Sequence, residues 1–168
     1  MVKMLGLGLI VLFCTLCGMA RASSLKSRTQ TLKKTLLFLH LLSERLSYTL
    51  SPLDDIFTTL SADPLLEGLD FIMLCDRKLA GHMPFPQAFH ESVECCRCAL
   101  DKRDRALLEE IGDVVGTSSA SNQMEGLALV RANLTEQARA AEEDMNRRAR
   151  LYASLGLLSG TAIAIILI

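Results

Sequence analysis

The chain has 168 residues, half of them apolar, with a formal net charge of −1 and no tryptophan. This length supports one domain of ordinary size together with membrane segments. The near-neutral charge excludes a general electrostatic field that would attract nucleic acid or an acidic membrane surface. Leu, Ala, Glu and Arg are abundant and only four Pro occur, which favours helices.

Apolar residues concentrate at the two ends of the chain. No charged residue occurs from Met4 to Ala20 or from Leu151 to Ile168. These runs measure roughly 25–27 Å as helix, which is at the short end of what spans a bilayer core. The sequence therefore predicts an N-terminal transmembrane helix over residues 1–21 and a C-terminal one over residues 151–168. Between them, residues 22–150 form a polar central domain.

Basic residues flank both apolar runs on the side of the central domain. They are Arg21, Lys26, Arg28, Lys33 and Lys34 after the first run, and Arg147, Arg148 and Arg150 before the second. Only Lys3 lies on the far side. Because basic flanks stay in the cytoplasm, the pattern predicts a two-pass membrane protein with a cytoplasmic central domain.

The N-terminal run has an alternative interpretation as a signal peptide. Lys3, the apolar core and the small residue Ala20 fit a secretory signal, and Asn133-Leu134-Thr135 fits a glycosylation sequon. The chain would then be a secreted or surface-anchored helical protein with a cleaved signal peptide and a processed tail. The basic cluster that abuts the tail, in place of a small-residue spacer, disfavours this alternative.

Small residues recur at a spacing of four in the C-terminal run. Gly156, Gly160 and Ala164 lie on one helix face, which is the spacing that lets membrane helices approach closely. We expect them to pack against another helix, in this chain or in a partner. The alternative is that Gly and Ala are simply common in membrane helices.

The sequence of the central domain predicts a series of helices. A helix over residues 23–50 has an apolar stripe through Leu32 and Leu39, and residues 36–42 are apolar nearly all round, which predicts burial on more than one side. Ser51 and Pro52 then start a short helix to about Leu60. Further along, Asp63-Pro64 starts another helix. Its expected inner face is Leu65, Leu69, Ile72 and Leu79.

Turn and cap residues predict three further helices in the second half of the chain. A loop around Gly81, Pro84 and Pro86 precedes a helix with the stripe Phe85, Phe89, Val93, Cys96 and Leu100. Asp101 caps a further helix that Gly116 ends, and Ser118 or Ser119 caps the last helix, which runs from about Ala120 into the C-terminal run. The stripe expected of that last helix is Leu127, Val130, Leu134, Ala138, Ala141, Met145, Ala149 and Tyr152. Past Leu134 it is mostly Ala, so we expect shallow burial there, in a stalk or, as the alternative, in a surface that receives a partner helix. With no alternating stretch typical of a strand, the fold class is all-α, a bundle of about six helices.

No constellation of side chains predicts catalysis. Cys75, Cys95, Cys96 and Cys98 lack a second Cys-x-x-Cys pair, and three of them crowd one expected helix, so reduced, partly buried thiols are favoured over a metal site. Paired carboxylates fall on adjacent helix positions that face different directions. No phosphate-binding loop or set of basic and aromatic residues occurs. We expect no enzyme, no cofactor, no small-molecule substrate and no nucleic-acid ligand.

Several motifs, in order, resemble the stage III sporulation protein AB family. The clearest is Leu-Tyr-Ala-Ser-Leu-Gly-Leu-Leu-Ser-Gly over residues 151–160, which runs into the apolar end of the chain. Weaker matches are Leu-Ser-Glu-Arg-Leu-Ser-Tyr over residues 42–48, Ser-Pro-Leu over residues 51–53, the Asp-rich helix from Asp101, and Gln123. The resemblance covers essentially the whole chain.

The resemblance implies a role in endospore development. Family members sit in the mother-cell membrane around the forespore, in a secretion-like channel complex, and their soluble domain is similar to the helical bundle of the type II secretion inner-membrane platform. By this analogy the chain would contact a secretion-type ATPase and other membrane subunits of the complex. The candidate partner-binding residues are Glu44, Ser51, Pro52, Leu53 and Gln123, which could equally be structural caps.

Overall fold

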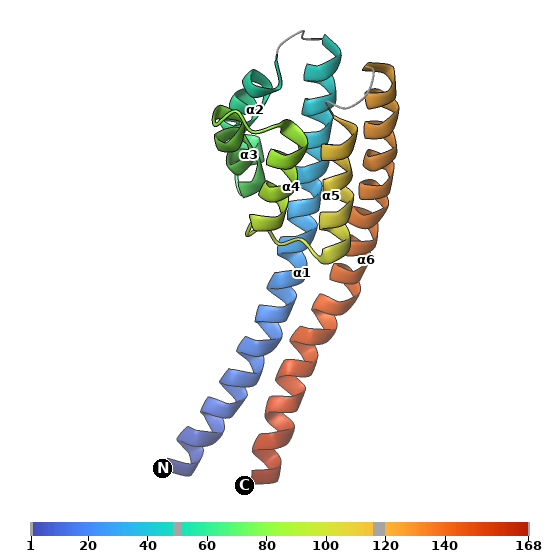
Figure 1. The fold of residues 1–168 in the computed structure, drawn as a ribbon. Coiled ribbons are helices and arrows are strands. Elements are labelled where there is room, and N and C mark those ends of the chain that lie inside the picture. Colours follow the sequence, from blue (N-terminus) through green and yellow to red (C-terminus); the bar gives the residue numbers. More distant parts are fainter. Residues whose placement is uncertain (1, 49–51, 116–119, 168) are drawn as a thin grey trace. The chain divides into compact units, whose positions relative to one another are not determined.

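The computed structural model describes residues 2–48, 52–115 and 120–167, and within these ranges the only regular secondary structure is helical (Figure 1). Of the side chains before residue 20 and after residue 148, it describes only Leu16, Leu151 and Ser154. The α-helices are α1 (Val2–Tyr48), α2 (Leu53–Ser61), α3 (Asp70–Ala80), α4 (Phe85–Cys95), α5 (Lys102–Val114) and α6 (Ala120–Leu167), and a 3-10 helix, η1 (Pro64–Leu66), lies between α2 and α3. The predicted all-α class with about six helices is confirmed.

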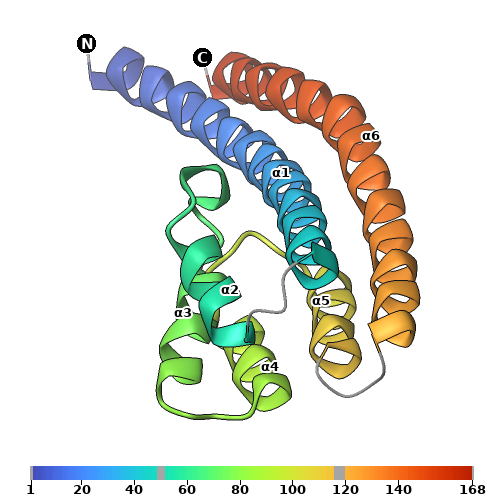
Figure 2. The same cartoon turned by 90° about the horizontal axis from the view of Figure 1, so that it is seen from above.

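Two compact units make up the chain. The first combines Met1–Thr29 with Arg139–Ile168, and the second is Gln30–Ala138. In the first unit, segments of α1 and α6 lie side by side (Figure 2). They are joined where the buried hydroxyl of Thr29 donates to the carbonyl of Ala141 at 3.3 Å.

The second unit has an apolar core supplied by all of its helices. In α1, Phe38, Leu39 and Leu42 are fully buried, which confirms that this part of the helix is covered on more than one side. In α6, every residue of the predicted stripe from Leu127 to Ala138 is buried. No Gly or Pro interrupts residues 19–48, so the helix expected after the N-terminal run is continuous with it in α1.

Aromatic rings form the centre of the second unit. Phe89 of α4 contacts four other rings, with centroid distances from 5.5 Å to Phe85 to 6.5 Å to Phe38. Phe57 and Phe71, from α2 and α3, complete the cluster. Edge-to-face and offset pairs at these distances stabilise a core beyond the area that they bury. The cluster therefore ties four helices to one another.

The segment after Asp63-Pro64 differs from the prediction. The Asp63 carboxylate accepts the amide of Leu65 at 2.9 Å, so Asp63 is a cap as expected, but it caps only the three-residue η1. Gly68 then adopts φ +90°, a left-handed conformation that ends the helical path. Helix α3 begins afresh at Asp70, and Leu65 is 62% exposed. The prediction that Leu65 lies on the inner face is wrong.

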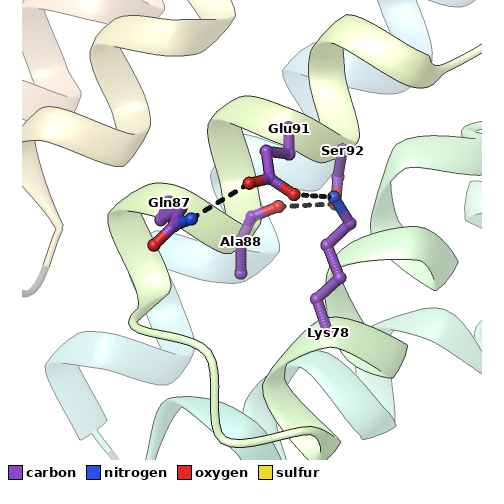
Figure 3. Close-up of polar contacts among 5 residues, drawn as sticks. All are labelled: Lys78, Gln87, Ala88, Glu91 and Ser92. Atoms are coloured by element: carbon purple, nitrogen blue, oxygen red, sulfur yellow. Dashed lines mark hydrogen bonds and ion pairs between the residues drawn. The ribbon is translucent and has the colours of Figure 1, made fainter.

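Polar contacts join α3 to α4 at the surface of the second unit (Figure 3). Lys78 Nζ of α3 donates to Glu91 Oε2 of α4 at 2.5 Å, and Gln87 donates to the other carboxylate oxygen at 3.1 Å. These hydrogen bonds, first that from Lys78, lower the pKa of Glu91. Beneath them, the buried Ser92 hydroxyl donates to the Ala88 carbonyl at 2.6 Å.

Helix α5 begins as predicted. Asp101 accepts the amides of Arg103 and Asp104, each at 2.9 Å, and the Asp104 carboxylate accepts the Asp101 amide at 3.0 Å. This reciprocal arrangement is a capping box, which satisfies the first amides of the helix. The helix ends at Val114. Gly116, Ser118 and Ser119, the predicted stop and caps, lie outside the described residues.

Candidate functional site

An open groove of about 500 Å³ lies in the second unit, between the end of α1 and the beginning of α6. Its two walls come from helices that are joined at the tip, where Ser47 Oγ donates to Met124 Sδ at 3.4 Å. The lining residues are Ser43 from α1, and Met124, Leu127, Ala128, Arg131, Ala132, Thr135 and Glu136 from α6.

The groove combines an apolar floor with a charged rim. Leu127 is 1% exposed and forms the base, whereas Ala128 and Ala132 are small and exposed, which leaves the groove open. Arg131 and Glu136 are exposed and place one charge of each sign at the edge. An apolar floor with polar edges is the surface that an amphipathic helix of a partner recognises.

Two of the predicted partner-binding residues are sequence neighbours of residues that line this groove, but neither is itself a lining residue. Glu44 is exposed and adjoins Ser43 in α1, and its carboxylate lies 3.7 Å from His40 Nε2. Gln123 is half-buried and adjoins Met124 in α6. Because Ser43 and Met124 both line the groove, segments that are far apart in the sequence belong to one end of the second unit.

The other predicted partner-binding residues lie at or just before the start of α2. Pro52 is exposed immediately before α2, and its carbonyl accepts the amide of Ile56 at 3.3 Å, while Leu53 is the first residue of α2 and half-buried. Pro52 therefore lies just outside the helix rather than at its first position. Ser51 lies outside the described residues, as does most of the polar turn before Gln123.

Sequence reasoning missed the α6 wall of the groove. Ala128, Arg131, Ala132 and Thr135 follow the spacing i, i+3, i+4 and i+7, which is a helical stripe next to the buried one. The signal was present, but the stripe is built of small and polar residues that ordinarily face water.

The proposed helix-packing residues of the C-terminal run cannot be placed. The backbone of α6 is helical through Leu167, but the side chains of Gly156, Gly160 and Ala164 lie outside the described residues. Within the part of the chain that the structure describes, no helix is both long and apolar enough to cross a membrane.

The cysteines are arranged differently from the prediction. Helix α4 ends at Cys95, so Cys96 and Cys98 lie in the connection to α5 and do not continue the helical stripe. Four described thiols are free, with Cys95 exposed and Cys75, Cys96 and Cys98 buried. Among the described residues, no three His, Cys, Asp or Glu side chains come together as metal ligands.

Arg105 of α5 binds the carbonyls at the C-terminal end of α4. Its Nη1 donates to the carbonyl of Val93 at 2.6 Å and to that of Glu94 at 3.3 Å, and its Nη2 donates to that of Cys96 at 3.1 Å. A cation at the C-terminal end of a helix satisfies its last carbonyls and interacts favourably with the helix dipole.

The geometry defines an all-α protein in which two long helices bracket four shorter ones in the sequence, with an open helical groove and no described metal cluster. The model of one protein family, stage III sporulation protein AB, matches residues 3–168. The chain therefore belongs to the stage III sporulation protein AB family and is a stage III sporulation protein. No curated protein and no solved structure matches it.

Proposed function

We propose that this chain is a non-enzymatic platform subunit of a secretion-like channel complex needed for endospore development. In this role it couples a cytoplasmic secretion-type ATPase to the other membrane subunits. Family membership over residues 3–168 supports the sporulation role. The observation that supports the coupling role is the open groove between α1 and α6, which has an apolar floor and a rim with charges of both signs.

The proposed topology has two membrane passes. Residues 1–21 and 151–168 would cross the mother-cell membrane around the forespore, with residues 22–150 in the cytoplasm. The support is in the sequence, since both charge-free runs are flanked by basic residues on the side of the central domain.

This topology predicts the outcome of a reporter experiment. A reporter that is active only in the cytoplasm, inserted after Gly81 in an exposed turn of the second unit, should be active in sporulating cells. The same reporter appended after Ile168 is the control and should be silent. Activity outside the cytoplasm at residue 81, or a mature chain that begins after Ala20, would instead support the secreted alternative.

The groove is the proposed ATPase-binding surface. Its floor is apolar and its rim carries both charges, so a partner helix with an apolar face could bury that face there and pair its edges with Arg131 and Glu136. On the α1 side, Ser43 lines the groove.

Blocking the groove should weaken ATPase binding. Ala132→Arg places a long charged side chain in the groove at an exposed helical position, so we expect the bundle to stay folded and the affinity to fall about tenfold or more. The measurement is a binding titration of the full-length chain in mild detergent with the purified ATPase.

The matched control makes the same substitution elsewhere. Ala106→Arg is also at an exposed helical position, on α5, and does not line the groove. It should leave the affinity unchanged. Charge reversal by Glu44→Lys should weaken binding less than Ala132→Arg. If Ala132→Arg and Glu44→Lys both bind as well as the wild type, the groove is not the ATPase surface.

A further inference from the structure

A hydrogen bond fixes the register of the two helices in the first unit. The Thr29 hydroxyl of α1 donates to the Ala141 carbonyl of α6, so these two residues lie at one level along the pair. The helices are antiparallel, since the first residues of α1 and the last residues of α6 lie at the same end of the pair (Figures 1 and 2). Both rise about 1.5 Å per residue. Arg21 and Ala149, each eight residues from the bonded pair, therefore lie near one level.

This register aligns the boundaries of the two charge-free runs. The N-terminal run ends at Ala20, next to Arg21, and the C-terminal run begins at Leu151, two residues beyond Ala149. Nothing in either run alone sets the position of the other along the helix pair. The alignment is therefore a property of the folded first unit, which has one common boundary between its apolar and its charged part.

The exposed side chains change character at this boundary. On the side of the chain ends, Leu16 and Leu151 are 54% and 52% exposed. On the other side, Arg21 of α1 and Arg147 and Arg148 of α6 are exposed, and we call these three residues the basic collar. Exposed apolar side chains next to exposed cations are typical of helices at a lipid–water interface.

The collar is locally cationic, although the net charge of the whole chain is −1. No Asp or Glu precedes Glu44 in the sequence, so α1 brings only cations to this level. On α6, Asp144 Oδ1 lies 3.2 Å from Arg148 Nε, so one carboxylate offsets part of the charge of three guanidinium groups. A guanidinium can bind two oxygens of one phosphate through its planar fork of donors.

We propose that the basic collar binds the phosphate groups of anionic phospholipids, in the leaflet that faces the central domain. The inference rests on the proposed two-pass topology, because only chain ends embedded in the bilayer bring the collar to the level of the headgroups. Leu16 and Leu151 then contact acyl chains, while guanidinium groups from both helices contact phosphates. The attraction of exposed basic residues to an anionic leaflet adds to this binding and weakens with salt.

Lipid retention measures the proposed binding. The full-length chain, purified in mild detergent, is incubated with equal amounts of phosphatidylglycerol and phosphatidylcholine, and the retained lipids are counted by native mass spectrometry. We expect phosphatidylglycerol to be retained about tenfold over phosphatidylcholine, with a smaller preference at high salt. Inorganic phosphate, which lacks acyl chains, should not displace the lipid. Displacement by it would assign the collar to free phosphate and overturn the proposal.

Matched variants assign the preference to the collar. Arg21→Gln combined with Arg147→Gln should lower the preference about fivefold or more, and the other basic residues after the N-terminal run should keep the orientation of the chain. Lys102→Gln combined with Arg103→Gln is the control, because it removes the same charge from exposed positions of α5 in the second unit. It should leave the preference unchanged. Lysine at both collar positions should restore only part of the preference, since the charge returns without the fork.

Alkaline extraction of the membranes separates this inference from the proposed topology. If the wild-type chain is extracted as a peripheral protein, the two-pass topology and the position of the collar are both wrong. If the chain stays embedded but retains the two lipids equally, the collar does not bind anionic lipid and the topology stands. An equal loss of preference in the collar variant and in the control would likewise overturn the proposal.

Discussion

Phe89→Ala is expected to lower the free energy of unfolding by about 4 kcal/mol, the largest effect of any single substitution considered for this chain. The Phe89 side chain is fully buried, and its ring contacts Phe85 at 5.5 Å and Phe71 at 5.9 Å between centroids. Truncation to alanine removes a ring that α1, α2 and α3 all contact, and it leaves a cavity that the surrounding rings cannot fill without moving.

Denaturant titration of the full-length chain in mild detergent measures this loss, with helical circular dichroism as the signal. Leu65→Ala is the control, because Leu65 is 62% exposed in η1 and should change stability by no more than about 0.5 kcal/mol. If both variants unfold at the same denaturant concentration as the wild type, the aromatic cluster is not the centre of the core.

Arg105→Met is expected to cost about 2–3 kcal/mol, because it leaves partly buried carbonyls without a donor. Arg105 donates to the carbonyls of Val93, Glu94 and Cys96, at distances from 2.6 Å to 3.3 Å. Methionine keeps much of the apolar stem but none of the donors. The same titration measures the effect.

Two substitutions separate the hydrogen bonds from the charge. Arg103→Met, at an exposed position of α5, removes a cation without removing these bonds and should be nearly neutral. Arg105→Lys should recover only part of the stability, since an ammonium cannot reproduce the planar fork of donors. Equal losses for Arg103→Met and Arg105→Met would show that the contacts at the end of α4 contribute nothing specific.

The sequence predicted the helices that strong local signals specify. The capping box at Asp101 and the stripe from Leu127 to Ala138 both appear as expected, because capping and periodic burial depend on residues close together in one helix. The region from Asp63 to Cys98 was predicted less well. There, Gly68 ends the path of η1, and Arg105 of the next helix binds the end of α4. The second feature is a contact between helices, which the pattern of α4 alone does not encode.

The candidate site was also predicted only in part from the sequence. Glu44 and Gln123 were chosen from motifs, and each is next in sequence to a lining residue, Ser43 or Met124, without lining the groove itself. The residues that shape the groove, Ala128 and Ala132, gave no such signal. The groove exists because small side chains leave space between α1 and α6 once these helices pair. No single segment of the sequence encodes this space.

The fluorescence of Tyr48 can report on a ligand that enters the groove. The chain has no tryptophan and only two tyrosines, and Tyr48 is 88% exposed, next to the Ser47 that contacts Met124 at the groove. Its emission is therefore not masked by any indole, and Tyr152→Phe would leave it as the sole strong ultraviolet emitter. A ligand without fluorescent residues that enters the groove would thus change a signal native to the protein, with no dye attached.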